Sequence, residues 1–112
     1  MQYRQAKYAI GQIVQHRYLG YRGVIVDVDY AYALDQAVLN EVNANLSNEG
    51  KPPLEADQPF YVILSGDTQD HLYISEVNLR DYDDFLDVDH EEIPQYFQSV
   101  EQGHYVPRFS VH

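Results

Sequence analysis

The sequence predicts a mainly β domain, a small and strongly bent sheet or barrel. Four or five short strand candidates, joined by hairpin turns, account for most of the apolar pattern, with one helix inserted among them. Short strands joined in this way favour antiparallel pairing over a parallel α/β fold. The chain has 112 residues, 45% of them hydrophobic, which suffices for one domain, residues 1–112, with its own core.

The first two strands surround a bend. Residues 11–16 form a short strand candidate, and the bend at 18–23 is bracketed by Gly20 and Gly23, so we expect Gly23 to allow a sharp turn or a positive φ. Residues 24–29 form the clearest strand. The alternation predicts Val24, Val26 and Val28 in the core and Ile25, Asp27 and Asp29 toward water.

A helix and a second hairpin follow. Asp35 is placed to cap a helix over residues 35–46, and an apolar stripe is expected along it at Val38, Leu39, Val42 and Leu46. Residues 48–59 contain one glycine and three prolines and form a loop. Residues 60–64 predict a central strand and 65–70 a turn. Residues 71–75 then return as its partner, extended by 76–79.

The C-terminal third is expected to lie outside the barrel core of residues 8–80. Residues 81–92 hold seven acids in twelve positions and predict an exposed acidic linker. Three-four spacing of apolar residues predicts a short helix over 93–100, opened by Pro94. Residues 103–112 are expected to pack as an extended strap that ends this C-terminal part, 93–112.

Charge divides the chain unevenly. Residues 1–26 carry about +4, and the rest carries all 18 acids and about −15, which gives the net charge of −11. An acidic body repels phosphate, so nucleic acid is expected to bind only through the basic start. The chain has no cysteine, no apolar signal segment and no long apolar run. We therefore expect a cytoplasmic protein that does not enter a membrane.

Four segments carry a further pattern: IGQIVQHR (10–17), GYRGVIVDVD (20–29), QPFYVIL (58–64) and YISEVNL (73–79). In this order and spacing they resemble the HspQ family, also called YccV-like or hemimethylated-DNA-binding domain proteins. The ending, residues 96–108, is similar to that of the longer members. Tyr30 and Val62 depart from the family pattern, where a proline and a histidine are usual.

The resemblance implies a fold and two roles. The implied fold is an SH3-like barrel of five antiparallel strands with the helix inserted between strands. One implied role is that of a heat-shock protein that brings substrates to an ATP-dependent protease. The other is binding of hemimethylated DNA.

The bend supplies the candidate contact surface. Arg17, Tyr18, Tyr21 and Arg22 lie together there and can grip an acidic or aromatic peptide, or stack on bases and neutralise phosphates. The alternative interpretation is structural: the tyrosines cover the barrel end while the arginines pair with the acidic body. Gly20 and Gly23 are assigned to the turn.

The sequence offers no catalytic group, cofactor site or metal site. Asp27 and Asp29 are more typical of the wet face of a strand than of an acid–base pair. Residues 81–92 match several acidic positions of a calcium loop, but Phe85 and Leu86 occupy positions that need a ligand and a glycine. The five histidines lack ligand spacing, and His90 beside Glu91 and Glu92 suits an adventitious ion only.

We therefore predict a non-enzymatic adaptor whose partners are an ATP-dependent protease and its protein substrates. DNA binding is the second hypothesis, because four positive charges are few for a DNA-binding surface. A purely structural subunit of a homo-oligomer is the third, suggested by the 11 tyrosines.

Overall fold

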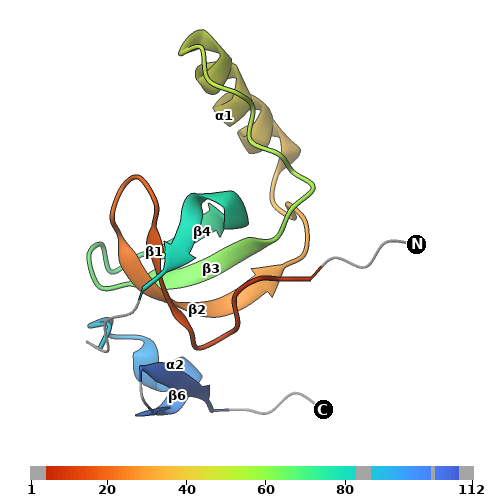
Figure 1. The fold of residues 1–112 in the computed structure, drawn as a ribbon. Helices are drawn as coiled ribbons and strands as arrows, with labels where there is room; N and C mark the ends of the chain where they lie inside the picture. Colours follow the sequence, from red (N-terminus) through yellow and green to blue (C-terminus); the bar gives the residue numbers. More distant parts are fainter. Residues whose placement is uncertain (1–4, 83–86, 102, 109–112) are drawn as a thin grey trace.

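The computed structural model describes residues 5–82, 87–101 and 103–108 of the chain (Figure 1). Strands predominate, as predicted, and they alternate with short helical segments. In chain order the elements are β1 (Ile13–His16), β2 (Arg22–Asp29), α1 (Gln36–Asn48), β3 (Phe60–Ser65), β4 (His71–Ser75), the 3-10 helix η1 (Glu76–Asn78), β5 (Leu79–Asp81), α2 (Ile93–Tyr96), β6 (Phe97–Glu101) and β7 (His104–Pro107).

Five strands form one antiparallel sheet in the order β4-β3-β2-β1-β5. This confirms the mainly β, antiparallel prediction. Within the residues that the structure describes, no pairing joins the outer strands β4 and β5, so the closed SH3-like barrel is not confirmed. The strand predicted to run through residues 71–79 is in fact interrupted. It ends at Ser75, η1 turns the chain, and β5 then pairs with β1 on the opposite edge.

A bulge in β2 divides the predicted valine face. Val24 is buried as predicted, and Val26 packs against the same core. The register with β3 shifts between Ile25 and Asp27, which inserts one residue and moves Val28 to the other face, where it packs with Ile25. Ile25 is fully buried rather than exposed because both faces of the sheet are covered. The core that contains Ile25 fills one face of the sheet and includes Tyr8, Val14, Tyr61, Ile63 and Leu79.

A second core covers the other face of the sheet. The predicted helix over 93–100 is wrong beyond residue 96, because Phe97 begins β6, which pairs with β7 as a separate two-stranded sheet. Phe97 and Tyr105 from this hairpin pack with Ile13, Val24 and Leu64 of the large sheet. Part of the predicted strap is thus a strand, and residues 109–112 of it lie outside the described ranges.

The acidic segment is only partly exposed where the structure describes it. Val88 and His90 are buried, so the exposed-linker prediction is wrong at these two positions. Gly66 lies close to this segment, because a Cβ on it would come within 3.2 Å of the backbone of Asp89. Residues 83–86, which include the acids at 83 and 84, lie outside the described part.

Helix α1 begins as predicted, and it projects from the sheet at the end opposite the C-terminal hairpin (Figure 1). The Asp35 carboxylate accepts a hydrogen bond from the Ala37 N–H at 2.9 Å. The predicted stripe is wrong at Val38 and Val42, which are 52% and 38% exposed, whereas Leu39 is buried. No helix among the described residues is long and apolar enough to cross a membrane.

The excursion that contains α1 closes at its base. The Tyr32 N–H donates to the Ala56 carbonyl at 2.9 Å, so the chain leaves and re-enters the sheet at neighbouring points. Asn43 fastens the helix to the returning loop, since its side chain accepts from the Leu54 N–H at 2.7 Å and donates to the Leu54 carbonyl at 3.5 Å.

Candidate functional site

The tip of the β1–β2 hairpin, residues 17–21, is organised by the side chain of His16. Its Nδ1 accepts hydrogen bonds from the backbone N–H groups of Tyr18 at 3.1 Å and Leu19 at 2.9 Å. Gly20 has a φ of 78°, a conformation that suits glycine, and donates to the His16 carbonyl at 3.0 Å. Partial burial lowers the pKa of His16 below its ordinary value of 6.5, and this favours the neutral ring that the two bonds require.

Gly23 does not form part of this turn. It lies inside β2, opposite Val14 and Ser65, and its φ is not positive. A Cβ at this position would come within 2.4 Å of the Ile63 side chain and 2.6 Å of the Leu64 carbonyl. The physical need for glycine here is therefore the close approach of β2 to β3 rather than a bend.

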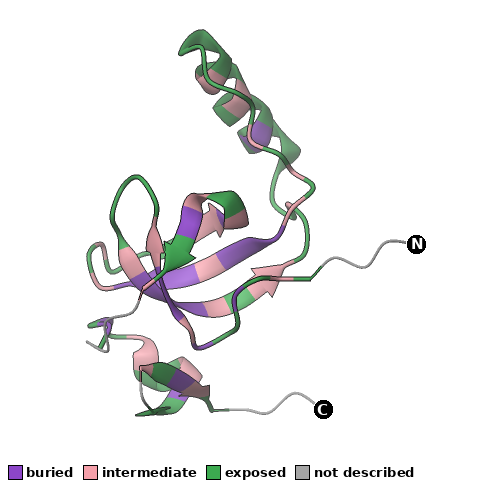
Figure 2. Ribbon diagram, viewed as in Figure 1, coloured by how far each residue is buried: buried purple, intermediate pink, exposed green. Residues whose placement is uncertain are grey.

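The tip carries exposed apolar side chains into solvent. Tyr18 is 76% exposed and Leu19 is 66% exposed. Figure 2 shows the whole tip as an exposed loop above the buried strands. Exposed apolar groups that lie together are a common mark of a surface that meets another molecule.

These side chains form one wall of an apolar groove, which we call the tip groove. It consists of two adjoining hollows of about 840 Å³ and about 250 Å³ that share His16, Leu19, Leu54 and Asn78. Tyr18 lines the larger hollow and Tyr21 the smaller one. The other described lining residues are Leu46, Lys51, Pro52, Pro53, Glu55, Asp57, Gln58, Phe60, Leu72, Tyr73, Ile74, Ser75 and Val77.

The two arginines predicted for the contact surface do not line the described walls of the tip groove. Arg17 donates from Nη2 to the Leu79 carbonyl at 3.1 Å. Arg22 points to a separate polar hollow, where its guanidinium lies 5.1 Å from the centre of the Tyr82 ring and donates to the Asp87 carbonyl at 3.3 Å. Tyr18 and Tyr21 thus line adjoining parts of the tip groove, whereas Arg22 lines a separate hollow.

Charge at the rim of the tip groove is mainly negative. Glu55 and Asp57 line the larger hollow. Lys51 also lines it, but its ammonium group lies 3.2 Å from the Glu49 carboxylate, which offsets its charge. A positively charged flank on a bound molecule would therefore find a favourable potential here.

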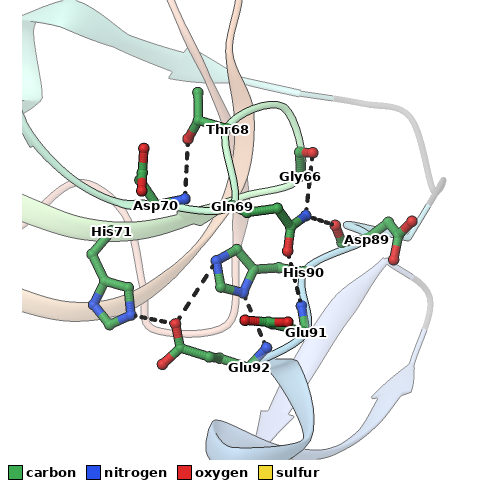
Figure 3. A network of polar contacts seen from close by, with 9 residues as sticks. All are labelled: Gly66, Thr68, Gln69, Asp70, His71, Asp89, His90, Glu91 and Glu92. Carbon is green, nitrogen blue, oxygen red and sulfur yellow. Dashed lines mark hydrogen bonds and ion pairs between the residues drawn. The ribbon is translucent and has the colours of Figure 1, made fainter.

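A second polar cluster joins the β3–β4 turn to the segment before α2 (Figure 3). The His71 Nε2 lies 2.8 Å from the Glu92 carboxylate, and the Gln69 amide donates to the Asp89 carbonyl at 2.7 Å while accepting from the Glu91 N–H at 3.3 Å. His90 is buried, and its Nδ1 accepts from the Glu92 N–H at 3.0 Å.

The contacts of this cluster fasten the β3–β4 turn to residues 89–92. Among the described residues, no group of three or more potential ligands is placed to hold a metal ion.

The carboxylates that the sequence singled out are used for local hydrogen bonds. Asp29 accepts from the Tyr73 hydroxyl at 2.9 Å, and Asp27 accepts from the Val28 N–H at 2.8 Å. Glu76, a further carboxylate at the start of η1, accepts from the Lys7 N–H at 2.8 Å and from the Tyr61 hydroxyl at 2.7 Å. Burial, together with the Asp29 carboxylate, raises the pKa of Tyr73 to about 12, so this hydroxyl keeps its proton as a donor.

Sequence reasoning missed most of the tip groove. Leu19, Leu54 and Val77 are apolar residues in loops or turns, where no strand or helix period draws attention to them. The sequence did contain one signal for this surface. Leu19 in the glycine-containing bend and Val77 between Glu76 and Asn78 are isolated apolar residues without an apolar pattern around them, which is typical of an exposed contact surface.

A family described as "YccV-like: Hemimethylated DNA-binding protein YccV like" matches residues 6–104 of the chain. The match begins before β1, spans the whole five-stranded sheet and α1, and extends to the first residue of β7.

Proposed function

Since the chain belongs to the YccV-like family, whose description is that of a binding protein, we propose that it works by binding and not by catalysis. The proposed role is that of an adaptor that holds protein substrates for an ATP-dependent protease. Tethering of this kind raises the local concentration of the substrate without new chemistry.

The observation that carries the proposal is the tip groove. An apolar groove with two strongly exposed side chains, Tyr18 and Leu19, suits the apolar segments that damaged proteins expose. Its acidic rim and the net charge of −11 favour a protein partner over a phosphate backbone.

The proposal is tested by reconstitution. Addition of the chain to a purified ATP-dependent protease should speed the degradation of a heat-denatured substrate. Leu19→Asp should remove most of this stimulation, because it places a charge in the apolar groove. The matched control is Val100→Asp in β6, an exposed valine that does not line the described groove and should leave the stimulation intact. If wild-type chain leaves degradation unchanged for every such protease of the cell, the adaptor proposal is wrong.

Binding of hemimethylated DNA is the second candidate, favoured by the printed description of the family. Arg17 and Arg22 keep their charge but already donate to backbone carbonyls, which leaves fewer of their N–H groups for phosphate. Two guanidinium groups are also few for a DNA-binding surface. A phosphate-binding surface loses affinity steeply as salt rises. Titration of hemimethylated and unmethylated duplexes at several salt concentrations tests this candidate, which fails if methylation has no effect or if physiological salt abolishes binding.

A cytoplasmic location and a homo-oligomeric state stay predictions. Cell fractionation tests the first, and sedimentation of the purified chain alone tests the second.

A further inference from the structure

The two edges of the five-stranded sheet differ in how they are protected. Strand β5 carries Arg80 and Asp81, and charged side chains commonly keep other strands away from a sheet edge. Strand β4 has the sequence HLYIS, with no lysine, proline, acidic residue or bulge. Its one paired neighbour within the described part of the chain is β3. The outer edge of β4 therefore lacks the charged residues that protect β5, and it is exposed to partly exposed from His71 to Ile74 and buried at Ser75.

The register of β4 shows which backbone groups face outward. The Glu76 N–H donates to the Pro59 carbonyl at 2.9 Å, so residues 59 and 76 form a hydrogen-bonded pair. Bonded and non-bonded pairs alternate along an antiparallel ladder. Tyr73, opposite Val62, and Ser75, opposite Phe60, therefore direct their N–H and C=O groups away from β3. Tyr73 is partly exposed, whereas Ser75 is only 2% exposed, so an added strand has to displace the groups that cover Ser75.

The smaller hollow of the tip groove lies along this same edge. Leu72 and Ile74, which pack against the first core, line it together with Tyr73 and Ser75 from the other side of the strand. A hollow lined from both sides of one strand borders the edge of that strand. The hairpin tip forms the facing wall, through Leu19 and Tyr21.

Beyond β4 the hollow continues past η1 into the larger part of the groove. Leu54, Asn78 and Leu19 line both parts, so a bound segment can pass from one to the other. The far part is apolar at Leu46 and Val77 and acidic at its rim, at Glu55 and Asp57.

We propose that the outer edge of β4 binds an extended segment of a partner polypeptide by strand addition. The segment pairs its backbone with Tyr73 and Ser75, places apolar side chains in the tip groove, and positions lysine or arginine residues at the acidic rim. Strand addition gives affinity through the main chain, which suits many different sequences. This inference rests on the proposed function and specifies how the adaptor holds its substrates.

The test uses a synthetic peptide as the probe. A fluorescein-labelled heptapeptide has lysine at both ends and alternating leucine and threonine between them, so that side-chain burial fixes its register. Two further peptides carry N-methyl groups either on the leucines or on the threonines. Only alternate N–H groups of an added strand face β4. The peptide whose methyl groups block these N–H groups should bind at least about tenfold more weakly, because main-chain hydrogen bonds are removed. The other methylated peptide should bind nearly as well as the parent.

A pair of variants of the chain gives the complementary measurement. Ser75→Pro removes the outward N–H, and the φ of −67° at Ser75 already matches that of proline. Ser75→Ala keeps this N–H, and the hydroxyl that it removes is buried and has no hydrogen-bond partner among the residues that the structure describes. We expect Ser75→Pro to weaken binding of the parent peptide about fivefold to tenfold and Ser75→Ala to leave it unchanged. Ser75 is buried, so thermal unfolding of both variants is recorded first, and the methylated peptides decide alone if Ser75→Pro does not fold.

Each outcome separates this inference from the adaptor proposal. If the parent peptide and both methylated peptides bind alike, side chains alone hold the ligand and strand addition is wrong, although the groove still binds protein. If the parent peptide does not bind while Leu19-dependent degradation persists, strand addition is again wrong and the adaptor stands. If Ser75→Pro instead dissociates a self-associated chain, a second copy occupies the edge and the inference is overturned.

Discussion

At the scale of single residues, His16 shapes the candidate site, although the sequence only indicated that it is not a metal ligand. Its ring accepts two backbone hydrogen bonds and so holds Tyr18 and Leu19 at the mouth of the tip groove. These bonds require Nδ1 without a proton. Protonation of His16 therefore competes directly with the conformation of the tip.

This competition predicts a pH dependence of the tip. The lowered pKa of His16 means that the unfolded chain takes up the proton more readily than the folded chain. The stabilisation is complete above the ordinary pKa of 6.5 and decreases as the pH falls below it. Amide exchange at Tyr18 and Leu19, corrected for intrinsic rates, should show less protection at about pH 5.5 than at about pH 7.5.

The control for this measurement is His16→Asn. The asparagine carbonyl can accept at the same place as Nδ1 but does not titrate. Protection at the tip should then vary little across the same pH range. Equal pH dependence in both proteins would show that another group is responsible.

At the scale of elements, local patterns predicted the strands of the first sheet well and its interruptions poorly. The cap at Asp35 and the strands around Ile13, Val24, Phe60 and His71 follow from signals within a few residues. The bulge after Ile25 and the end of β4 at Ser75 depend on pairing with distant strands, which no local period contains.

The C-terminal helix prediction failed for the same physical reason. Helical spacing is found at Ile93, Tyr96, Phe97 and Val100. Residues 97–101 are nevertheless stabilised more by pairing with β7, where the ring centres of Phe97 and Tyr105 lie 5.3 Å apart. The candidate site was predicted in part, since Tyr18 and Tyr21 line the groove, whereas strand alternation at the start of β2 directs Arg22 elsewhere. The loop 51–58 that completes the groove carries no periodic signal.

Helix α1 gives a prediction at this scale. It is fastened to the groove wall mainly through the Asn43 side chain and Leu39, so Asn43→Ala should loosen α1 and the loop at Leu54. We expect a local cost of about 1 to 2 kcal/mol, seen as faster amide exchange in α1. Asn45→Ala, at an exposed position of the same helix, is the matched control. A loss of global stability equal to the local loss would contradict the limited attachment of this helix.

At the scale of the whole molecule, the sheet is covered on both faces, and one cover comes from the C-terminal hairpin. The Val88 N–H donates to the Tyr105 hydroxyl at 2.8 Å within the second core. The same core contains Ile13 and Val24 of the large sheet, so it joins the hairpin to that sheet. The hairpin β6–β7 is therefore an integral part of the folding unit.

This integration predicts one cooperative unfolding transition. Phe97→Ala should lower the free energy of unfolding by about 3 to 5 kcal/mol, because it removes a large buried ring. Val100→Ala, at an exposed position of the same strand, should change it by less than about 0.5 kcal/mol. Calorimetry checks both, and two separate transitions with only one displaced by Phe97→Ala would show that the hairpin folds independently.

The hydrogen bond between Tyr32 and Ala56 has a consequence for the evolution of the molecule. Since the two stems of the excursion meet there, residues 33–55 form a cassette whose contacts with strand β4 include the hydrogen bond from the Ala33 N–H to the Tyr73 hydroxyl and the position of Leu54 beside Leu72 in the groove. Exchange of this cassette would reshape the far wall of the groove while the β scaffold stays the same. One scaffold can thereby acquire a differently shaped groove wall through a single graft point.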